Sequence, residues 1–446
     1  MCQRPSIDRT PSGDALADAF KKGKGNAAIG DRPGTAFDGG RDTAGARPAA
    51  TPVPLVPTRR PATPPPFKLS DLRAAIPPHC FHRSAARSLA YVALDLALLA
   101  LAALAASRIG PTFPASPLAR GVAWALYWSV AGCVGTGAWV CAHECGHGAF
   151  STSPTLNDAV GAALHTLLLV PYWSWKFSHA RHHAHTGDVE GDEVFVPPVS
   201  WDAGTAGRAS LAGTATGRAL RSAPGRLAAI GAALTLGWPL YLTLNVSGRS
   251  NYDHGREGRE DPSPSFLPPN HFDPGSPIFS KRQRAGVAGS AALVGGMLAA
   301  LAGAVQKHGA ATVFCFYGAP LLVTNAFLVV ITLLQHSHPA LPHYAASADW
   351  DWLRGALATV DRSFGPLLDA AFHHIADTHV LHHLFSGIPH YHAQEAAAAI
   401  KPVLGDWYAA DGRSVLRALW EDWRDCHWVS PDRPGESALW FRGDRD

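Results

Sequence analysis

Four long apolar runs constrain the fold of this chain more than any other feature. Residues 88–106, 119–141, 285–305 and 310–335 are nearly free of charge. Each run is close to the roughly 20 residues that a helix needs to cross the hydrocarbon core of a bilayer, which is about 30 Å thick. The overall content of 47% hydrophobic and 16% charged residues fits this pattern. The sequence therefore predicts an all-α integral membrane protein with four transmembrane helices in two hairpins.

Composition divides the chain into three parts. Residues 1–66 are rich in proline, glycine and alanine and predict a disordered tail, because they cannot bury enough apolar surface to offset the entropy of ordering. Residues 67–430 form the predicted membrane domain, and residues 431–446 a C-terminal tail. The net charge of +3 and the lack of a basic tract with interleaved aromatics argue against a nucleic-acid partner. The seven cysteines lack a framework spacing and predict apolar packing rather than disulfides.

Three segments outside the apolar runs carry histidines at helical spacing. On a helix, residues at i, i+3 and i+4 share one face, so each segment can point its imidazoles at one place. Eight imidazoles exceed what one four-coordinate zinc can use, and two metals fit better. Imidazole suits iron, zinc, copper and nickel. The candidate ligands are His143, His147, His179, His182, His183, His379, His382 and His383.

A ninth ligand is expected where the last apolar run ends. His336 and His338 are two residues apart and cannot share a helical face, and His336 is favoured because it continues the run most directly. Carboxylates are expected to orient a ligand imidazole by accepting a hydrogen bond from its other ring nitrogen. The candidates are Asp377 and one member of the acidic run Asp188, Glu190, Asp192 and Glu193, of which Asp188 is chosen.

Counting the crossings predicts which segments stay on one side. Arg83 and Arg87 precede the first run and favour a cytosolic N-terminus. All three histidine segments can share one site only if residues 159–175 form a re-entrant or interfacial element and residues 227–246 lie in the cytosolic interface. The predicted fold thus adds interfacial helices and a cytosolic helical cap that holds a histidine-rich dimetal site.

Two other readings of the histidines stay open. The segment His143-Glu144-Cys145-Gly146-His147 matches His-Glu-x-x-His, in which two histidines hold zinc and the glutamate is the general base of a metalloprotease. That reading leaves both His-x-x-His-His segments without a role. A histidine-rich metal carrier is the third reading.

The histidine segments as they stand here resemble the three boxes of membrane fatty-acid desaturases, specifically the Δ12 (oleate) desaturases of the endoplasmic reticulum of plants, algae and fungi. The resemblance extends from Phe67 to Trp423 and includes Asp192-Glu-Val-Phe-Val-Pro197 and Trp350-Asp-Trp-Leu-Arg-Gly. Glu144 leans toward the Δ12 enzymes, whereas Gly148 is frequent in ω3 relatives.

This resemblance implies a non-haem diiron enzyme that uses O₂ and two electrons to insert a cis double bond. The implied substrate is an oleoyl chain on a membrane phospholipid, with phosphatidylcholine expected, and the product is a linoleoyl chain. The family's electrons come from NADH through a reductase and cytochrome b5. The implied location is the endoplasmic reticulum, with the metal site and N-terminus on the cytosolic side. An ω3 desaturase, hydroxylase or conjugase of the same family remains an alternative.

Overall fold

The computed structural model describes residues 59–110, 116–200, 214–249, 267–345 and 350–443, all within one compact unit. The N-terminal half contains α2 (Leu69–Ala75), η1 (Pro78–Phe81), α3 (Ala85–Ala106), α4 (Pro117–His147), α5 (Pro154–Leu167), α6 (Tyr172–His185), α8 (Ala215–Arg221) and α9 (Ala223–Leu244). The C-terminal half contains α10 (Arg284–His308), α11 (Ala310–Val313), η2 (Phe314–Gly318), α12 (Ala319–His336), β1 (His343–Tyr344), α13 (Trp352–Ala356), α14 (Pro366–Ala371), α15 (His379–Leu384), α16 (His390–Leu404), η3 (Gly405–Trp407), α17 (Val415–Asp425), β2 (Trp428–Pro431) and β3 (Ala438–Arg442).

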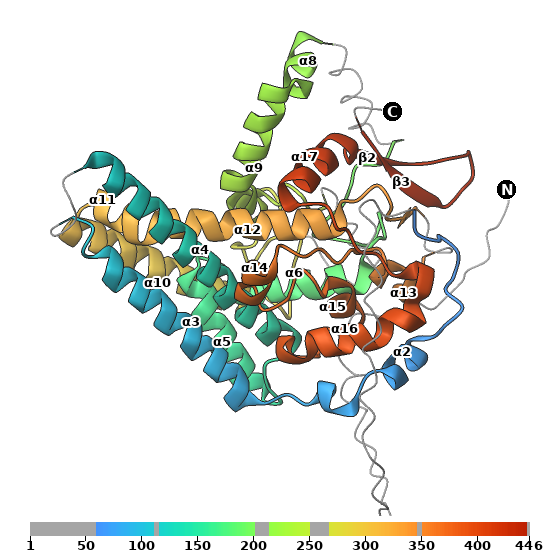
Figure 1. Ribbon diagram of the computed structural model, residues 1–446, viewed down its shortest axis with the longest axis horizontal. Helices are drawn as coiled ribbons and strands as arrows, with labels where there is room; N and C mark the ends of the chain where they lie inside the picture. The colour runs from blue at the N-terminus through green and yellow to red at the C-terminus, as the bar shows by residue number, and fades with distance from the viewer. Residues whose placement is uncertain (1–58, 111–115, 201–213, 250–266, 346–349, 444–446) are drawn as a thin grey trace, which may run out of the picture. The chain divides into compact units, whose positions relative to one another are not determined.

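The first hairpin consists of α3 and α4, which lie side by side (Figure 1). Ser84 and Ser116 cap the two helices by accepting hydrogen bonds from backbone N–H groups of the first turn. Helix α4 is 31 residues long and ends where Gly148 adopts the left-handed conformation, with φ 71°. The first histidine pair therefore lies on the last turns of the membrane helix itself.

Residues 159–175 contain no helix long enough to cross a bilayer. Helices α5 and α6 have 14 residues each, or about 21 Å at 1.5 Å per residue, against about 30 Å of hydrocarbon. They are separated by a bend in which Leu169 has φ 56°. This agrees with the re-entrant or interfacial element that the crossing count requires.

The second hairpin is formed by α10 and the continuous helical stretch α11–η2–α12. Gly309, with φ 84°, makes the turn between the two arms. The stretch passes through a π-helical turn at η2, and α12 then packs against both α4 and α9. It ends at His336, which is buried inside the fold and whose ring contacts those of His182, His379 and His383.

Among the described residues, five helices are long and apolar enough to cross a membrane: α3, α4, α9, α10 and the combined α11–α12. Four correspond to the predicted spans. The fifth, α9, covers the run at 227–246 that was expected to lie in the interface. Length and composition alone do not separate these two placements of α9.

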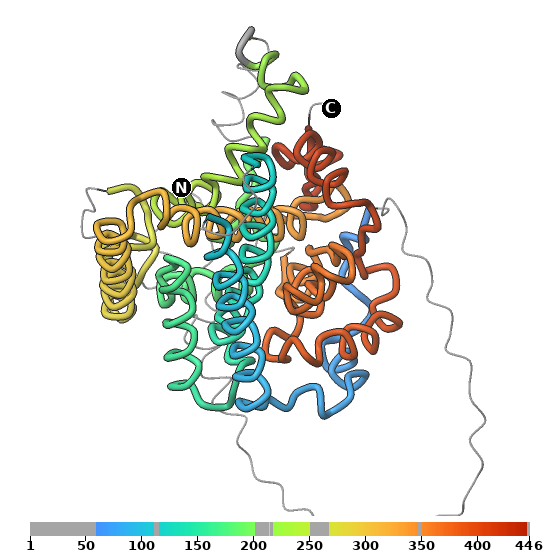
Figure 2. Tube along the Cα trace, turned by 60° about the vertical axis from the view of Figure 1, so that its left-hand side comes forward, coloured from blue at the N-terminus to red at the C-terminus, as the bar shows by residue number. Residues whose placement is uncertain are grey.

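Helices α2 and α13 to α16 gather beside one end of the membrane helices (Figure 2, blue and orange segments). Their main apolar cluster joins Leu72 of α2 to Val380 of α15 and Ile400 of α16. This assembly, called the cap below, carries the third histidine segment on α15.

Two expectations about the C-terminal region need correction. The fold is mostly helical but not all-α, because β1, β3 and β2 form a small antiparallel sheet in that order. Residues 431–446 are also not simply a tail, because β3 pairs with both other strands and buries Leu439 and Phe441. The boundary at residue 430 falls inside β2, which pairs with β3.

The N-terminal boundary lies slightly earlier than predicted. The backbone N–H of Arg60 donates to the carbonyl of Ala340, and Trp407 donates to the carbonyl of Thr63. Residues 59–66 thus contact the domain, while the rest of the predicted tail, residues 1–58, lies outside the described residues.

Candidate metal centre

Three helices from distant parts of the chain bring their histidines together. His143 and His147 lie one turn apart at the end of α4, and their ring centroids are 4.7 Å apart. The second triplet lies on α6 and the third on the short helix α15. The end of α12 adds His336.

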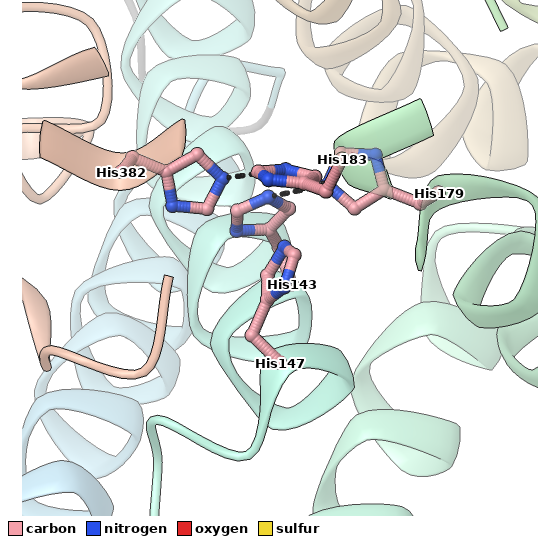
Figure 3. Close-up of side chains that lie close together, drawn as sticks. All are labelled: His143, His147, His179, His183 and His382. Atoms are coloured by element: carbon pink, nitrogen blue, oxygen red, sulfur yellow. Dashed lines mark hydrogen bonds between the residues drawn. The ribbon is translucent and has the colours of Figure 1, made fainter. Parts of the chain in front are cut away.

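The larger group contains five imidazoles that converge from α4, α6 and α15 (Figure 3). Each offers a ring nitrogen within 4.8 Å of the others. The Nε2 atom of His183 lies 3.2 Å from that of His179 and 3.1 Å from that of His382. His143 Nε2 is 3.0 Å from His179 Nε2. Group 1 comprises His143, His147, His179, His183 and His382.

A second group adjoins the first. His182, His336 and His383 offer ring nitrogens within 4.8 Å of one another. His379 joins them, because its Nε2 atom lies 3.2 Å from that of His336. Group 2 therefore comprises His182, His336, His379 and His383.

The two groups are in direct contact. The rings of His183 and His383 stack with centroids 4.1 Å apart and an interplanar angle of 11°. His183 belongs to group 1 and His383 to group 2, so the centres of the two groups are neighbours. His338, the competing candidate for the ninth position, belongs to neither. Its Nδ1 instead accepts a hydrogen bond from the Ala340 N–H, and its Nε2 lies 3.6 Å from Asp411.

The donor chemistry of both groups fits bound metal. In both groups the Nε2 atoms of several imidazoles face one another at hydrogen-bond distance. One buried Nε2 in each group has no hydrogen-bond partner: that of His147 in group 1 and that of His383 in group 2. Burial lowers the pKa of His179, His183, His382 and His383 well below the usual value. The rings are therefore neutral and their lone pairs are free to coordinate.

One buried carboxylate orients a ring of group 2. Both carboxylate oxygens of Asp192 lie 2.9 Å from His182 Nδ1, which leaves His182 Nε2 to face His336. This is the arrangement by which a carboxylate fixes the tautomer of a metal-binding histidine. His383 Nδ1 lies 3.2 Å from the Thr186 hydroxyl, a neutral partner in the same role.

The two carboxylates proposed from the sequence lie elsewhere. Asp188 faces His185 at 3.7 Å and accepts from the N–H of Glu190. Asp377 contacts His374 Nδ1 at 3.1 Å. Neither contacts group 1 or group 2. Asp192 lies in the same acidic run as Asp188, but the run follows the end of α6 in a turn, where residue spacing does not determine which side chain points back to the helix.

Two further carboxylate–histidine pairs connect the membrane helices to the cap. Glu144 of α4 lies 2.7 Å from His390 Nδ1 at the start of α16. Asp95 of α3 lies 2.9 Å from His373 Nε2. Because Glu144 is held by a histidine of another helix, it is not free to act as the base of a His-Glu-x-x-His protease. Asp95, a carboxylate inside an apolar run, is a signal that sequence reasoning could have used.

Comparison with known proteins decides the family. The model of the family described as "Fatty acid desaturase" matches residues 122–412, more than half of the chain. The chain belongs to the fatty acid desaturase family. A second model, described as "Domain of unknown function (DUF3474)", matches residues 56–106.

Similar desaturases cover nearly the whole fold. The chain is 49% identical to a Delta(12) fatty acid desaturase of Calendula officinalis over 86% of this chain and 93% of that protein. It is 48% identical to an endoplasmic-reticulum omega-6 fatty acid desaturase isozyme of Glycine max, with coverage of 86% and 93%. It is also 47% identical to the oleoyl-12-hydroxylase of Ricinus communis, with coverage of 86% and 92%.

A cavity borders group 1 of this desaturase on the cap side. The cavity is small, with a volume of about 20 Å³, and His143 and His382 are among its lining residues. Apolar side chains of α15 and α16 and of the segment between them line much of the rest, among them Leu381, Phe385 and Ile388. Glu144, His373, Thr378 and His390 also line it, so the cavity brings apolar and polar side chains together beside group 1.

Proposed function

We propose that this chain is an acyl-lipid desaturase that inserts a cis double bond at Δ12 of oleoyl chains on membrane phospholipid, giving linoleoyl chains. The observation that carries the proposal is the pair of adjoining histidine groups in a chain 49% identical to a Δ12 desaturase over 86% of its length. Δ12 enzymes recur among its relatives, in Punica granatum and Arabidopsis thaliana as well.

Each histidine group is proposed to hold one non-haem iron. Group 1 supplies five imidazoles and group 2 four, which matches the need for several protein ligands and an open position for oxygen at each metal. When bound, the iron pair supplies the activation of O₂ that lets an unactivated C–H bond break. The chain's own contribution is to fix nine imidazole rings in two adjoining sets before the metals arrive.

The residues around the groups have separate tasks. Asp192 holds the tautomer of His182. The apolar side chains of the cavity beside His143 and His382, among them Leu381 and Phe385, are proposed to pack against the middle of the acyl chain when it approaches group 1 and to exclude water from the reacting carbons. The Glu144–His390 pair keeps the cap in place over that cavity.

Four crossings are proposed, with α9 in the interface. The C-terminal ends of α4 and α12 both reach the histidines, and α10 begins beside α6, where Ser290 accepts a hydrogen bond from the Trp173 N–H. The chain between α6 and α10 therefore starts and ends on the same side. A crossing by α9 would need an additional return crossing within residues 245–283, which contain no second long apolar helix among their described residues.

The histidines and the cap are proposed to lie on the cytosolic side of the endoplasmic reticulum. The choice of the cytosolic side is based on the basic residues before α3 and α10, because cytosolic segments carry an excess of lysine and arginine. A cap that faces the cytosol lets a separate electron donor, proposed to be cytochrome b5 with its NADH reductase, reach the metal site. The acyl chain of phosphatidylcholine is proposed to enter from the membrane.

Hydroxylation is the second candidate outcome. The Ricinus communis oleoyl-12-hydroxylase is 47% identical to this chain and covers the same share of it. Overall identity therefore does not separate removal of two hydrogens from insertion of one oxygen. An ω3 desaturase or a conjugase would likewise use the same histidine groups.

Expression in yeast that makes oleate but no diene tests the proposal. Gas chromatography of fatty acid methyl esters is expected to show linoleate with the wild-type chain, and none with His382→Ala, which removes a ring of group 1. His308→Ala, at the exposed end of α10, is the matched control and is expected to leave diene production unchanged. A hydroxy acid or a triene would redirect the assignment, and no new product despite verified iron-loaded protein would overturn it.

A further inference from the structure

A third set of metal-binding side chains lies apart from both histidine groups. His79 and Cys80 come from η1, the turn between α2 and α3, and His392 and Glu395 come from α16. One ligand atom of each residue lies within 4.8 Å of the others. None of the four belongs to group 1 or group 2, and the proposed reaction does not use them.

The measured spacings suit a tetrahedral ion. His79 Nε2 lies 2.9 Å from a carboxylate oxygen of Glu395, and 3.7 Å from the sulfur of Cys80. A tetrahedron with metal–ligand bonds of about 2.0–2.3 Å has edges of about 3.3–3.7 Å. For both atoms to bind one ion, the 2.9 Å separation between His79 and Glu395 would have to lengthen to that distance. The ring centroid of His392 lies 5.5 Å from that of His79, and His392 supplies the fourth candidate ligand.

The local folding explains why these residues meet. His392 and Glu395 are three residues apart on α16 and share one face. In η1, the tight turn buries Cys80 completely, while His79 stays exposed. Glu395 and His79, both half-exposed, therefore lie next to a buried thiol.

An exposed ion pair explains only half of this arrangement. The side chains of His79 and Glu395 are 53% and 51% exposed, as an ordinary surface pair would be. Such a pair needs neither a thiol beneath it nor a second imidazole beside it. One thiolate, two imidazoles and one carboxylate form a donor set that suits zinc. The thiolate argues against a non-haem iron site of the kind that is built from oxygen and nitrogen ligands alone.

We propose that His79, Cys80, His392 and Glu395 form a structural zinc site that fastens the start of the membrane domain to the cap. The two elements that it joins have defined positions. η1 leads directly into α3, the first membrane helix, and α16 begins at His390, which contacts Glu144 beside group 1. With four protein ligands the site is closed, as structural zinc sites are, and leaves no position for a substrate.

Metal analysis of the full-length chain, purified in detergent without added chelator, tests the site. We expect one zinc per chain beside the iron. Cys80→Ser and His392→Ala are each expected to lose that zinc while iron content stays at the wild-type level. Cys315→Ser is the matched control, because Cys315 lies in η2 and belongs to none of the possible metal-binding groups found in the described part of the chain. The zinc content of this variant should not change.

Spectroscopy of the wild-type chain keeps the test independent of variant folding. Zinc-edge absorption is expected to give one sulfur at about 2.3 Å with nitrogen and oxygen at about 2.0–2.2 Å. Cobalt added after zinc removal should give a thiolate charge-transfer band that Cys80→Ser lacks. Wild-type protein without stoichiometric zinc, and without a cobalt–thiolate band, would overturn the proposal whatever the variants do. Iron in place of zinc at these ligands would overturn the choice of metal.

Discussion

Replacing Asp192 with asparagine should weaken one metal of the pair and spare the other. Both side chains of the Asp192–His182 contact are almost completely buried, at 4% and 3% exposure, and both carboxylate oxygens lie 2.9 Å from His182 Nδ1. Asparagine keeps the shape, and its oxygen can still accept from the Val194 N–H as Asp192 does at 3.0 Å. The change therefore removes mainly the negative charge.

The size of the effect follows from that contact. A buried hydrogen bond to a charged group contributes about 1.5–3 kcal/mol. At about 1.4 kcal/mol per factor of ten, this corresponds to a loss of roughly 10- to 100-fold, the range typical for residues that orient a metal-binding histidine. The loss should fall on the iron of group 2, which contains His182, and not on that of group 1.

Chelator competition with iron analysis measures this directly. Asp192→Asn is expected to release one iron at a roughly 10- to 100-fold lower chelator concentration, and the second iron at the wild-type concentration. Asp188→Asn is the matched control from the same acidic run, because Asp188 faces His185 outside both groups. Wild-type affinity for both irons in Asp192→Asn, or an equal loss in Asp188→Asn, would refute the reasoning.

Three further changes test the packing and the buried charges. Gly161→Ala should destabilise the fold by about 1–3 kcal/mol, seen as a lower unfolding midpoint in detergent, because the new Cβ would lie 2.6 Å from the ring carbon Cζ of buried Tyr172. Arg362→Ala should cost about 3–5 kcal/mol in the same assay, because buried Arg362 pairs with both Asp411 and Asp422, and its loss leaves these two buried carboxylates to share Arg413 alone. Asp361→Asn should change the pH dependence of stability: burial raises the pKa of Asp361 to about 7 from 3.8, so the folded chain keeps a proton that the unfolded chain releases, and this group makes stability fall as pH rises from about 4 to about 7. The free energy of unfolding of the wild type relative to Asp361→Asn should decline across that interval.

Each change has an outcome that would contradict it. Gly231→Ala meets no atom within 4 Å and should be neutral, so equal losses for Gly231→Ala and Gly161→Ala would remove the packing argument. Arg417 is 59% exposed in its pair with Glu421, and Arg417→Ala should cost less than about 1 kcal/mol. A flat or rising stability difference between pH 4 and 7 would show that Asp361 is not protonated in the folded chain.

The sequence predicted which segments meet, because helical spacing and crossing number are local properties. The apolar runs led to four of the membrane helices, and the requirement for a shared side indicated that residues 159–175 do not cross. His336 rather than His338 lies with the other candidate ligands, since the helix of the span runs on through His336. That these histidines bind iron remains a prediction.

The sequence could not predict how the candidate ligands divide between group 1 and group 2. In the triplet on α6, His179 and His183 face one group while His182 faces the other, and this depends on the rotation of α6 against α4 and α12 rather than on spacing. For a related reason the sequence indicated the acidic run but not that Asp192, rather than Asp188, contacts a ring of group 2, because a turn sets the direction of each side chain. The pairing of β3 with β1 joins residues almost a hundred positions apart, which no local pattern encodes. The placement of α9 needs the path of the whole chain.

Iron titration of the metal-free chain in lipid nanodiscs with oleoyl-phosphatidylcholine, O₂ and reductant tests the central claim most directly. The yield of linoleoyl product is plotted against iron bound per chain. Two adjoining histidine groups that act together predict almost no product at one iron and full product at two, with the new double bond at Δ12. Full activity at one iron, or no diene at two, would contradict the account.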